Sequence, residues 1–254
     1  MQHDSTFLEA LGHGQADKRI AILRQIGQGG SISQAARSVG VSYKAAWQAL
    51  DTLTNLAGVA LVERVVGGAG GGGARLTPAG CELLAAADAM QQARADVASR
   101  MRHAGGAHAA AQRLQLRTSM RNQWPCTVLD LQTQGQIVRV QLRGEGGAAA
   151  GLLACARITR ESAELLGLAR GVAVQALCKA TAVHVQAAGA QAAGINQWPG
   201  RATRVARGPL GDEVAAEIAA GVQMVGFAAP GSGLRARTRV LMTADESSVA
   251  LALA

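Results

Sequence analysis

One phrase of the sequence occurs twice. Arg121–Cys126 reads RNQWPC and Ile195–Gly200 reads INQWPG, so the two copies lie 74 positions apart. A fixed offset of this size indicates a duplicated structural unit, which must fold twice into the same small domain. We expect the shared NQWP letters to form a turn with a buried tryptophan, which is a feature of the fold rather than of the function.

The texture of the chain divides it into a helical part and a β-rich part. Residues 18–103 show helical periodicity, and AGGAHAAAQ at 104–112 reads as a linker. From Leu114 onward, short alternating runs such as IVRVQLR predict closely spaced strands, which are typical of a small barrel or sandwich. The predicted domains are an N-terminal domain at 1–104, a linker at 105–113, and β-barrel repeats at 114–187 and 190–254.

The N-terminal part has the spacing of a helix-turn-helix. An apolar stripe over residues 20–26 ends at two glycines. Ser31 or Ser33 can cap a short Ala-rich second helix, Gly40 suits the tight turn after it, and Ser42 can cap a third helix. The apolar side of that third helix is expected to face inward and consists of Ala45, Ala46, Ala49, Leu50 and Leu53.

The outward face of the third helix is predicted to enter the major groove of DNA. Its hydroxyls, amide, single cation and two flat rings suit contacts to phosphates and base edges. The residues predicted to contact DNA from this motif are Ser33, Ser42, Tyr43, Lys44, Trp47 and Gln48. The alternative is a plain three-helix bundle with an exposed tyrosine and tryptophan, and the length of the match argues against it.

A glycine-rich segment follows the third helix. In LVERVVGGAGGGGARLTPAG, two β-prone runs flank the glycines, which predicts a hairpin wing with Arg64 and Arg75 placed to meet the DNA backbone. A nucleotide-binding phosphate loop would instead need GxxxxGK[ST] ahead of a helix. The segment contains no Lys-Ser/Thr pair, so a nucleotide site is disfavoured.

A long helix is predicted after the wing, with Thr77 as its cap and Pro78 at its first position. Apolar residues recur along it every three or four positions, as in a coiled coil, and Arg94 interrupts them. This stripe consists of Leu83, Ala87, Met90, Val97 and Met101. We favour a dimer contact over packing against the domain's own core, because a two-fold dimer presents two reading helices to two half-sites.

Composition disfavours several classes of protein. The 254 residues contain no apolar run long enough for a membrane helix and no signal-peptide pattern, so we expect a cytoplasmic protein without a membrane contact. The four cysteines form no CxxC pair and are expected to be reduced and buried, and no metal site or catalytic set can be placed, so no enzyme is expected. Most of the net charge of +8 lies after residue 104, where we expect an anion rather than a nucleic acid.

Together these motifs resemble a known family. GSISQAARSVGVSYKAAWQAL, the wing VERVVGGAGGGGARLT and TSMRNQWP are similar to the molybdate-dependent transcriptional regulators of the ModE family, from about Lys18 to Ala254. The resemblance implies an α+β multidomain fold, with a LysR-like winged helix-turn-helix and dimerisation helix followed by two OB-like β-barrel (Mop) repeats. It also implies a homodimer that binds double-stranded operator DNA and molybdate, and that accepts tungstate.

The resemblance further implies where the oxyanion binds. Molybdate is a tetrahedral dianion whose oxygens accept hydrogen bonds, so its site must offer donors, and a carboxylate there would repel it. In the family the site forms between the subunits of the dimer. The matching positions are Ser119, Arg121, Thr159, Ser162 and Lys179, with backbone around Ala180. Singly, each is explained as a strand residue, an edge charge or a helix cap, whereas the set favours a ligand site.

The second repeat departs from that set. Alignment on NQWP puts Ala193 opposite Ser119 and Ile195 opposite Arg121, so the second copy lacks the hydroxyl and the guanidinium. We predict that it keeps the barrel but not the equivalent site. A different site in that repeat would use Arg235, Arg237 or Ser232.

The sequence thus predicts a molybdate sensor that controls genes of molybdate uptake or of molybdenum enzymes. One alternative is a molybdate or tungstate storage or homeostasis protein without specific DNA binding. A second is an enzyme. A third keeps the DNA reader but changes the anion to tungstate or sulfate; sulfate is smaller and would leave the donors too far away.

Overall fold

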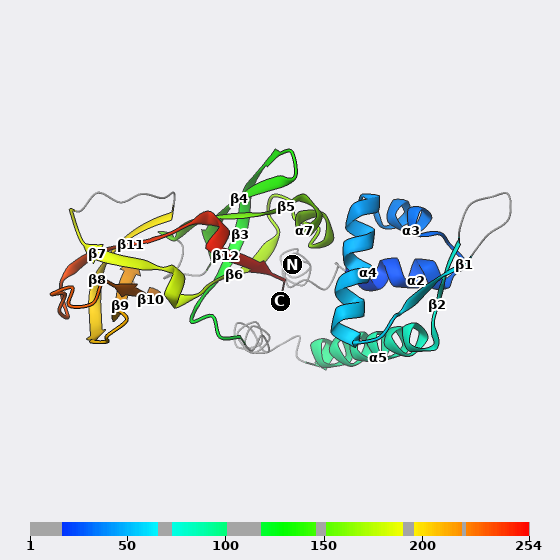
Figure 1. Ribbon diagram of the computed structural model, residues 1–254, viewed down its shortest axis with the longest axis horizontal. Coiled ribbons are helices and arrows are strands. Elements are labelled where there is room, and N and C mark those ends of the chain that lie inside the picture. The colour runs from blue at the N-terminus through cyan, green and yellow to red at the C-terminus, as the bar shows by residue number, and fades with distance from the viewer. Residues whose placement is uncertain are drawn as a thin grey trace. The chain divides into compact units, whose positions relative to one another are not determined.

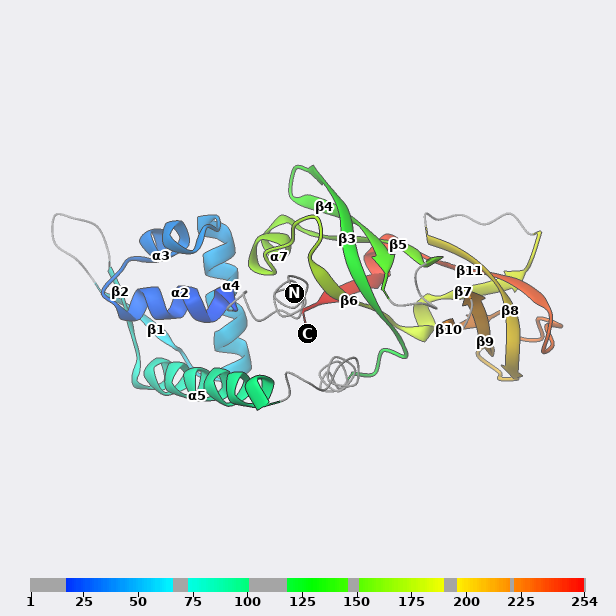
Figure 2. The ribbon, with the colours of Figure 1, turned by 180° about the vertical axis from the view of Figure 1, so that it is seen from behind.

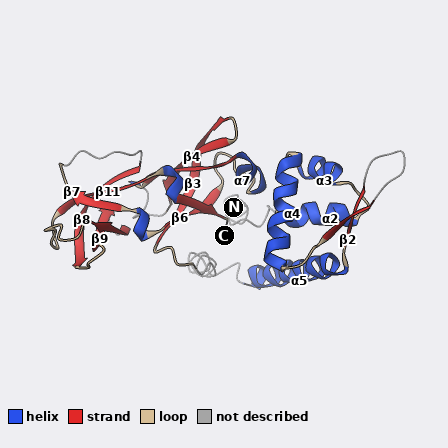
Figure 3. Cartoon of the chain, in the orientation of Figure 1, coloured by secondary structure: helices blue, strands red, loops and turns tan. Residues whose placement is uncertain are grey.

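The computed structural model of the chain describes residues 17–65, 73–100, 118–145, 151–189, 196–219 and 222–253 (Figure 1). They belong to two compact units. The first comprises the chain up to Gln112 together with Arg160–Leu168, and the second comprises Arg113–Thr159 together with Ala169–Ala254. Helices dominate the first unit and strands dominate the second (Figure 3). The predicted combination of a helical N-terminal region with β-rich repeats is therefore confirmed.

The first unit has a three-helix core with a hairpin and a long helix. Its elements are α2 (Lys18–Gly27), α3 (Ile32–Val39), α4 (Tyr43–Ala57), β1 (Val62–Val65), β2 (Gly73–Leu76), α5 (Pro78–Arg100) and α7 (Arg160–Leu165). The Oγ atoms of Ser31 and Ser42 accept the backbone N–H groups of Gln34 and Ala45 at 3.2 Å, so these serines cap α3 and α4. Of the two candidate caps for α3, Ser31 is the one used, and Ser33 lies within the helix.

Small side chains let α3 and α4 pack closely in this unit. Gly40 ends α3 with a φ of 70°, a left-handed conformation that favours glycine, as the tight turn required. The five residues predicted to face inward from α4 are all buried, and four of them share one core with Leu23 and Ile26 of α2, namely Ala46, Ala49, Leu50 and Leu53. The helix-turn-helix prediction is confirmed at the level of caps, turn and core.

The wing and the long helix also form as predicted. β1 and β2 pair antiparallel, from Val62 opposite Leu76 to Val65 opposite Gly73, while the tip at 66–72 lies outside the described residues. Thr77 Oγ1 accepts the N–H of Gly80 at 3.1 Å, so it caps α5.

The second unit consists of two sheets built from the repeats. Its elements are β3 (Asn122–Gln134), β4 (Ile137–Gly144), β5 (Leu153–Thr159), β6 (Ala173–Cys178), η2 (Ala180–Ala182), β7 (His184–Ala187), β8 (Asn196–Ala206), β9 (Asp212–Ala219), β10 (Val222–Ala228), β11 (Arg239–Ala244), η3 (Glu246–Ser248) and β12 (Val249–Ala252). The first sheet has five strands in the order β12-β6-β3-β4-β5, and the second is a closed barrel in the order β10-β7-β11-β8-β9. The two orders match strand for strand when the last strand of each repeat is exchanged.

Because these last strands are exchanged, the boundaries of the folded sheets differ from the boundaries of the sequence repeats. β7 ends the first repeat but pairs with β10 and β11 of the second barrel, and β12 ends the second repeat but pairs with β6 of the first sheet (Figures 1 and 2). The stretches 114–187 and 190–254 are thus repeats of sequence, and neither completes its own sheet.

The NQWP phrase forms strand rather than the expected turn. It lies at the start of β3 and of β8, where Asn122 and Asn196 already pair with β6 and β11, so its backbone groups belong to the ladder. The buried tryptophan is confirmed in both copies. Trp124 and Trp198 are each 4% exposed, and their ring centroids lie 5.9 Å apart.

The four cysteines are free, and two of them are buried. Burial raises the pKa of Cys126 to about 12 and that of Cys178 to about 11, so both thiols stay protonated at neutral pH. The expectation of burial is wrong for Cys81, whose position on α5 faces solvent, and Cys155 is only half-buried. Among the described residues, no helix combines the length and apolarity needed to cross a bilayer.

Candidate oxyanion site and DNA-binding face

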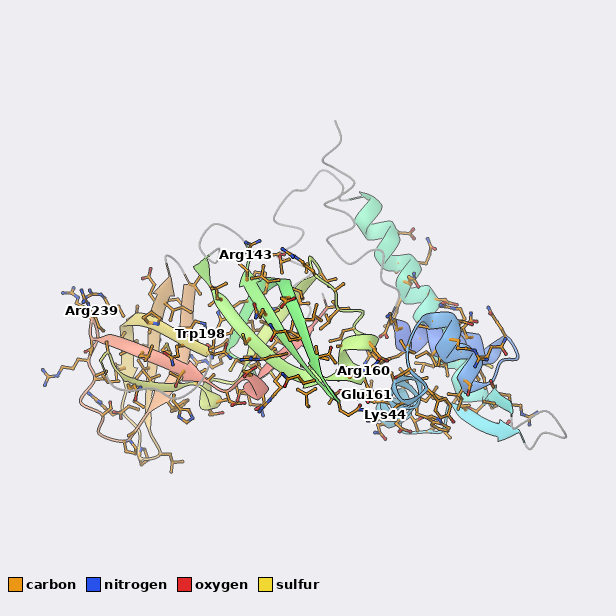
Figure 4. All side chains as sticks on the ribbon, turned by 90° about the horizontal axis from the view of Figure 1, so that it is seen from above. Lys44, Arg143, Arg160, Glu161, Trp198 and Arg239 are labelled. Atoms are coloured by element: carbon orange, nitrogen blue, oxygen red, sulfur yellow. The ribbon has the colours of Figure 1, made fainter. Side chains whose placement is uncertain are left out.

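The two asparagines of the repeated phrase join the two barrels. Asn122 Nδ2 donates to the carbonyl of Val225 at 2.8 Å, and Asn122 Oδ1 accepts the N–H of Val225 at 2.8 Å. Asn196 makes the same pair of bonds with Cys155, at 2.8 and 2.7 Å. Trp198 Nε1 adds a bond to the carbonyl of Leu153 at 2.8 Å (Trp198 is labelled in Figure 4). Each copy of the phrase therefore contacts the opposite barrel. The sequence interpretation does not include this role, for which the only signal in the sequence is the asparagine at the same place in both copies.

Four of the predicted oxyanion ligands lie at one end of the first sheet. The antiparallel register puts Asn122 opposite Cys178, so the next residues outward, Arg121 and Lys179, lie at the same end of β3 and β6. Both of these side chains are exposed. Ser119 is exposed just before β3, and Ala180 begins η2 directly after Lys179.

The segment that carries Ser119 and Arg121 is held by local hydrogen bonds. Thr118 Oγ1 accepts the N–H of Met120 at 3.2 Å, and Gln123 Nε2 donates to the carbonyl of Met120 at 2.8 Å. Thr118 and Gln123 therefore position the two predicted ligands on either side of Met120.

Of the other two predicted ligands, Thr159 lies at the opposite end of the sheet and Ser162 follows it in the chain. Thr159 is the last residue of β5 and pairs with Ile137, which itself pairs with Gln134 at the far end of β3. β3 has 13 residues and would span about 40 Å if it were straight. Ser162 follows three positions after Thr159 in the chain. One chain therefore carries a half-set at each end of the sheet, and the register keeps Thr159 away from Arg121.

The predicted arginine ligand, Arg121, forms an ion pair with a carboxylate. Arg121 Nη1 is 2.7 Å from Glu213 Oε2, and Arg204 Nη2 is 2.8 Å from Glu213 Oε1. The sequence interpretation missed Glu213, which follows 92 positions after Arg121 on β9 and belongs to the other barrel.

The second barrel carries an acid at the position that matches Lys179. Lys179 precedes η2, and Asp245 precedes η3, the equivalent turn. Hydrogen bonds from Ser247, together with Arg157 at 3.1 Å, hold the pKa of Asp245 below its usual value, so it is anionic at neutral pH and would repel an oxyanion. The signal was present in the sequence, where TADESSV aligns with LCKATAV. Positions 193 and 195, on which the loss of this site was predicted, lie outside the described residues.

The other site suggested for the second repeat loses one of its donors. Ser232 Oγ donates to Asp212 Oδ2 at 2.7 Å, and the Ser232 N–H donates to the same atom at 3.0 Å. These bonds, with help from Arg207, lower the pKa of Asp212 to about 2. The Ser232 hydroxyl is therefore committed to a carboxylate, while Arg235 and Arg237 are exposed.

The predicted DNA-reading face is exposed for the most part. Tyr43 is 53% exposed, and Ser33, Lys44 and Gln48 are exposed as well. Trp47 differs, since it packs partly against the domain core and meets the ring of Tyr43 edge-on at 6.3 Å.

Two carboxylates of α7, which belongs to the same unit, lie at the start of α4. Glu161 Oε1 is 2.7 Å from Lys44 Nζ, and both side chains are labelled in Figure 4. Glu164 Oε2 accepts the N–H of Ser42 at 2.8 Å. Although burial opposes it, the hydrogen bonds from Ser42 and Arg160 hold the pKa of Glu164 below its usual value. Two of the residues predicted to contact DNA, Ser42 and Lys44, are therefore paired with carboxylates of α7.

The remaining predictions concern the DNA contacts of the wing and the dimer contact of α5. Arg75 is exposed and forms a cross-strand ion pair with Glu63 at 2.5 Å, while the side chain of Arg64 lies outside the description. On α5, Leu83 packs against the domain's own core, and Met90 is 66% exposed. The described part of the stripe thus serves the core at its start and faces solvent further along; the side chains at 97 and 101 lie outside the described residues.

A winged helix-turn-helix on one chain with a duplicated β-barrel module defines a ligand-responsive DNA-binding regulator. Residues 18–81 match the family model of bacterial regulatory helix-turn-helix proteins of the lysR family, and residues 118–185 match the TOBE domain. The chain belongs to the ModE family of transcriptional regulators. It is 37% identical to the molybdenum transport protein ModE of Azotobacter vinelandii, over 83% of this chain and 80% of that protein.

Other relatives show the same relationship. The DNA-binding transcriptional dual regulator ModE of Escherichia coli K12 is 37% identical, over 75% of this chain and 74% of that protein. The molybdenum-pterin-binding protein MopB of Rhodobacter capsulatus is 37% identical, over 84% of this chain and 79% of that protein. Among solved structures, the cytoplasmic molybdate-binding protein ModG with molybdate bound shares the fold at 24% identity and a TM-score of 0.50, covering 55% of this chain and all of ModG.

Within the described ranges, no group of three His, Cys, Asp or Glu residues could hold a metal ion.

Proposed function

We propose that this chain is a molybdate-responsive transcriptional regulator whose C-terminal barrels bind the oxyanion and thereby control operator binding by the winged helix-turn-helix. The observation that carries the proposal is the presence, on one chain, of a helix-turn-helix of the lysR type and a TOBE domain, in a protein related along most of its length to ModE regulators. The proposal of molybdate as the ligand is supported by the molybdate-binding protein ModG and by the molybdenum named for the ModE and MopB relatives. Tungstate, of nearly the same size, is expected to be accepted in its place.

The proposed oxyanion site takes one half-set from each protomer of a homodimer. Its first half offers the hydroxyl, guanidinium and ammonium groups of Ser119, Arg121 and Lys179, with backbone at Ala180. Its second half offers the hydroxyls of Thr159 and Ser162. Every group is a hydrogen-bond donor, as a tetrahedral dianion requires. The separation of the halves along β3 supports a site that only a second copy completes.

The dimer that this site requires also serves the DNA-binding part. We propose that the exposed stretch of α5 around Met90 contributes to it, because two-fold symmetry then offers two reading helices to two half-sites. The protein acts in the cytoplasm as a sensor rather than as an enzyme. By linkage, operator DNA must raise molybdate affinity by the same factor by which molybdate raises operator affinity.

Gel-shift titration of operator DNA with and without molybdate tests this function. We expect a clear difference in operator affinity between the two titrations, and identical affinities would overturn the sensor. A storage or homeostasis protein would instead bind molybdate and show no preference for the operator over unrelated duplex DNA. Calorimetry with molybdate, tungstate and sulfate separates the anions, with sulfate expected to bind weakest because it is the smallest.

A further inference from the structure

We propose that Glu213 is an internal competitor of molybdate, holding Arg121 when the site is empty and releasing it when the oxyanion binds. The starting point is the contact of 2.7 Å between Glu213 Oε2 and Arg121 Nη1. A dianion bound by the same guanidinium would lie close to this carboxylate, and because like charges repel at that range, its binding disfavours the contact between Glu213 and Arg121. The inference rests on the proposed function, since it treats Arg121 as an oxyanion ligand.

The backbone on both sides of this ion pair is fixed. Asn122, the neighbour of Arg121, makes two hydrogen bonds to Val225 of β10. Val225 is paired with Ala215 of β9, and Glu213 lies two positions before Ala215 on the same strand. Arg121 and Glu213 therefore start from fixed points on facing barrels, and their contact follows from the joint between the barrels rather than from a freely moving loop.

Glu213 keeps a partner when Arg121 leaves it. Its second oxygen, Oε1, is 2.8 Å from Arg204 Nη2, so Glu213 still has an ion-pair partner after Arg121 is released. The Arg121 side chain is 48% exposed and that of Glu213 is 24% exposed. Ion pairs exposed to this degree stabilise proteins only weakly, so a doubly charged anion with several further donors can displace this one.

Glu213 therefore sets the affinity of the site in two ways. It occupies a ligand in the empty state, and it repels the dianion once that is bound. Glu213→Gln removes the negative charge, retains the length of the side chain and can still hydrogen-bond to Arg204. From the Coulomb energy of one charge near a dianion in a water-like dielectric, we expect molybdate to bind on the order of tenfold more tightly to E213Q than to the unmodified protein.

Calorimetric titration of the full-length protein with sodium molybdate tests this competition. The matched control is Glu217→Gln, which removes the same charge from an exposed position of the same strand, opposite Arg201. We expect E213Q to bind about tenfold more tightly and E217Q to stay within about twofold of the unmodified protein at low salt. The gain in E213Q should shrink as salt is raised, because exposed charges are screened, whereas a purely structural change would persist.

Two further variants separate the outcomes. In R121A the same Glu213→Gln change should give a smaller gain, because it still relieves the direct repulsion of the dianion but no longer releases a guanidinium. If the unmodified protein binds molybdate and E213Q binds it with equal or lower affinity, the competition is overturned while the proposed function stands. If the unmodified protein binds no molybdate in the titration, the proposed function fails, and the competition fails with it.

Discussion

At the scale of single residues, Arg121 is the side chain whose loss should weaken the proposed oxyanion site most. Because it is half-exposed, its truncation should cost little stability, whereas the loss of a charge-assisted bond to a dianion should weaken molybdate binding by about 10- to 100-fold. Calorimetry on R121A and on Arg143→Ala, an exposed arginine of β4, checks this expectation. Equal binding by R121A and the unmodified protein would remove Arg121 from the site.

On the DNA side, Lys44 is the cation at the amino end of the reading helix. Lys44→Ala should weaken operator binding and lower its dependence on salt, because one phosphate contact is lost. Molybdate affinity in the absence of DNA should not change. Gel shifts at several salt concentrations, with calorimetry alongside, measure both quantities, and an unchanged salt slope would argue that Lys44 does not contact a phosphate.

Asp212 is a buried carboxylate whose protonation at low pH is expected to lower the stability of the folded state. It is 1% exposed, and hydrogen bonds from Ser232, with Arg207, lower its pKa to about 2 from the usual 3.8. A depressed pKa stabilises the folded state fully above pH 4, and this contribution is lost as the pH falls from about 4 through about 2. Asp212→Asn should therefore melt at a lower temperature at neutral pH and depend less on acid than the unmodified protein does.

Thermal unfolding of both proteins between pH 7 and pH 2 measures this difference. Asp130→Asn, at an exposed position of β3, is the control for loss of one carboxylate. The assignment fails if the difference in Tm between the Asp212 variant and the unmodified protein is the same at pH 7 as at pH 2.

At the scale of elements, the caps and turns of the first unit can be predicted from the sequence, whereas the NQWP turn is wrong and the pairing partners of the strands are not predicted. Caps and turn residues such as Ser42 and Gly40 act within a few positions of themselves, so the sequence predicts α3 and α4 closely. The exchange of β7 and β12 depends on which sheet edge is free after the other strands have paired, and no local pattern encodes that. The same holds for Glu213, which reaches Arg121 only through the joint between the barrels.

That joint gives a paired prediction for β3 and β8. Asn122→Ala and Asn196→Ala each remove two hydrogen bonds to main-chain groups, so each should destabilise the second unit by about 2 kcal/mol. Only Asn122 adjoins predicted ligands. Molybdate affinity should therefore fall in N122A and stay near its normal value in N196A, as measured by calorimetry well below the melting temperature. Equal affinity losses in both variants would point to a general loosening of the barrels.

At the scale of the whole molecule, the exchanged strands make the two repeats a single cooperative body. The first sheet needs β12 from the end of the chain, and the second barrel needs β7 from before its own first strand. With the proposed half-sets of donors at opposite ends of one sheet, each chain would contribute one half to each of the two sites that it shares with its partner in the dimer, and it would not complete a site by itself. The second repeat can then lose its donors, as Asp245 in place of a lysine indicates, without loss of the barrel.

Complementation between damaged chains tests this division of the site. R121A damages the half-set at one end of the sheet, and Ser162→Ala damages the other. Each homodimer should bind molybdate weakly, because both of its sites carry the same defect. In a heterodimer of the two, isolated through a different affinity tag on each chain, both defects fall into one site and the other site is intact. Titration should then find about half the normal number of sites, each with normal affinity.

The control heterodimer joins R121A with Lys179→Ala. These residues lie at the same end of β3 and β6, so each of its two sites contains one defect and no normal site should appear. If the oxyanion were held entirely within one chain, the R121A and S162A pair would show no rescue either, because each chain would carry its own damaged site. Recovery in the first heterodimer and none in the second is the result that only a site shared between opposite ends of two chains can give.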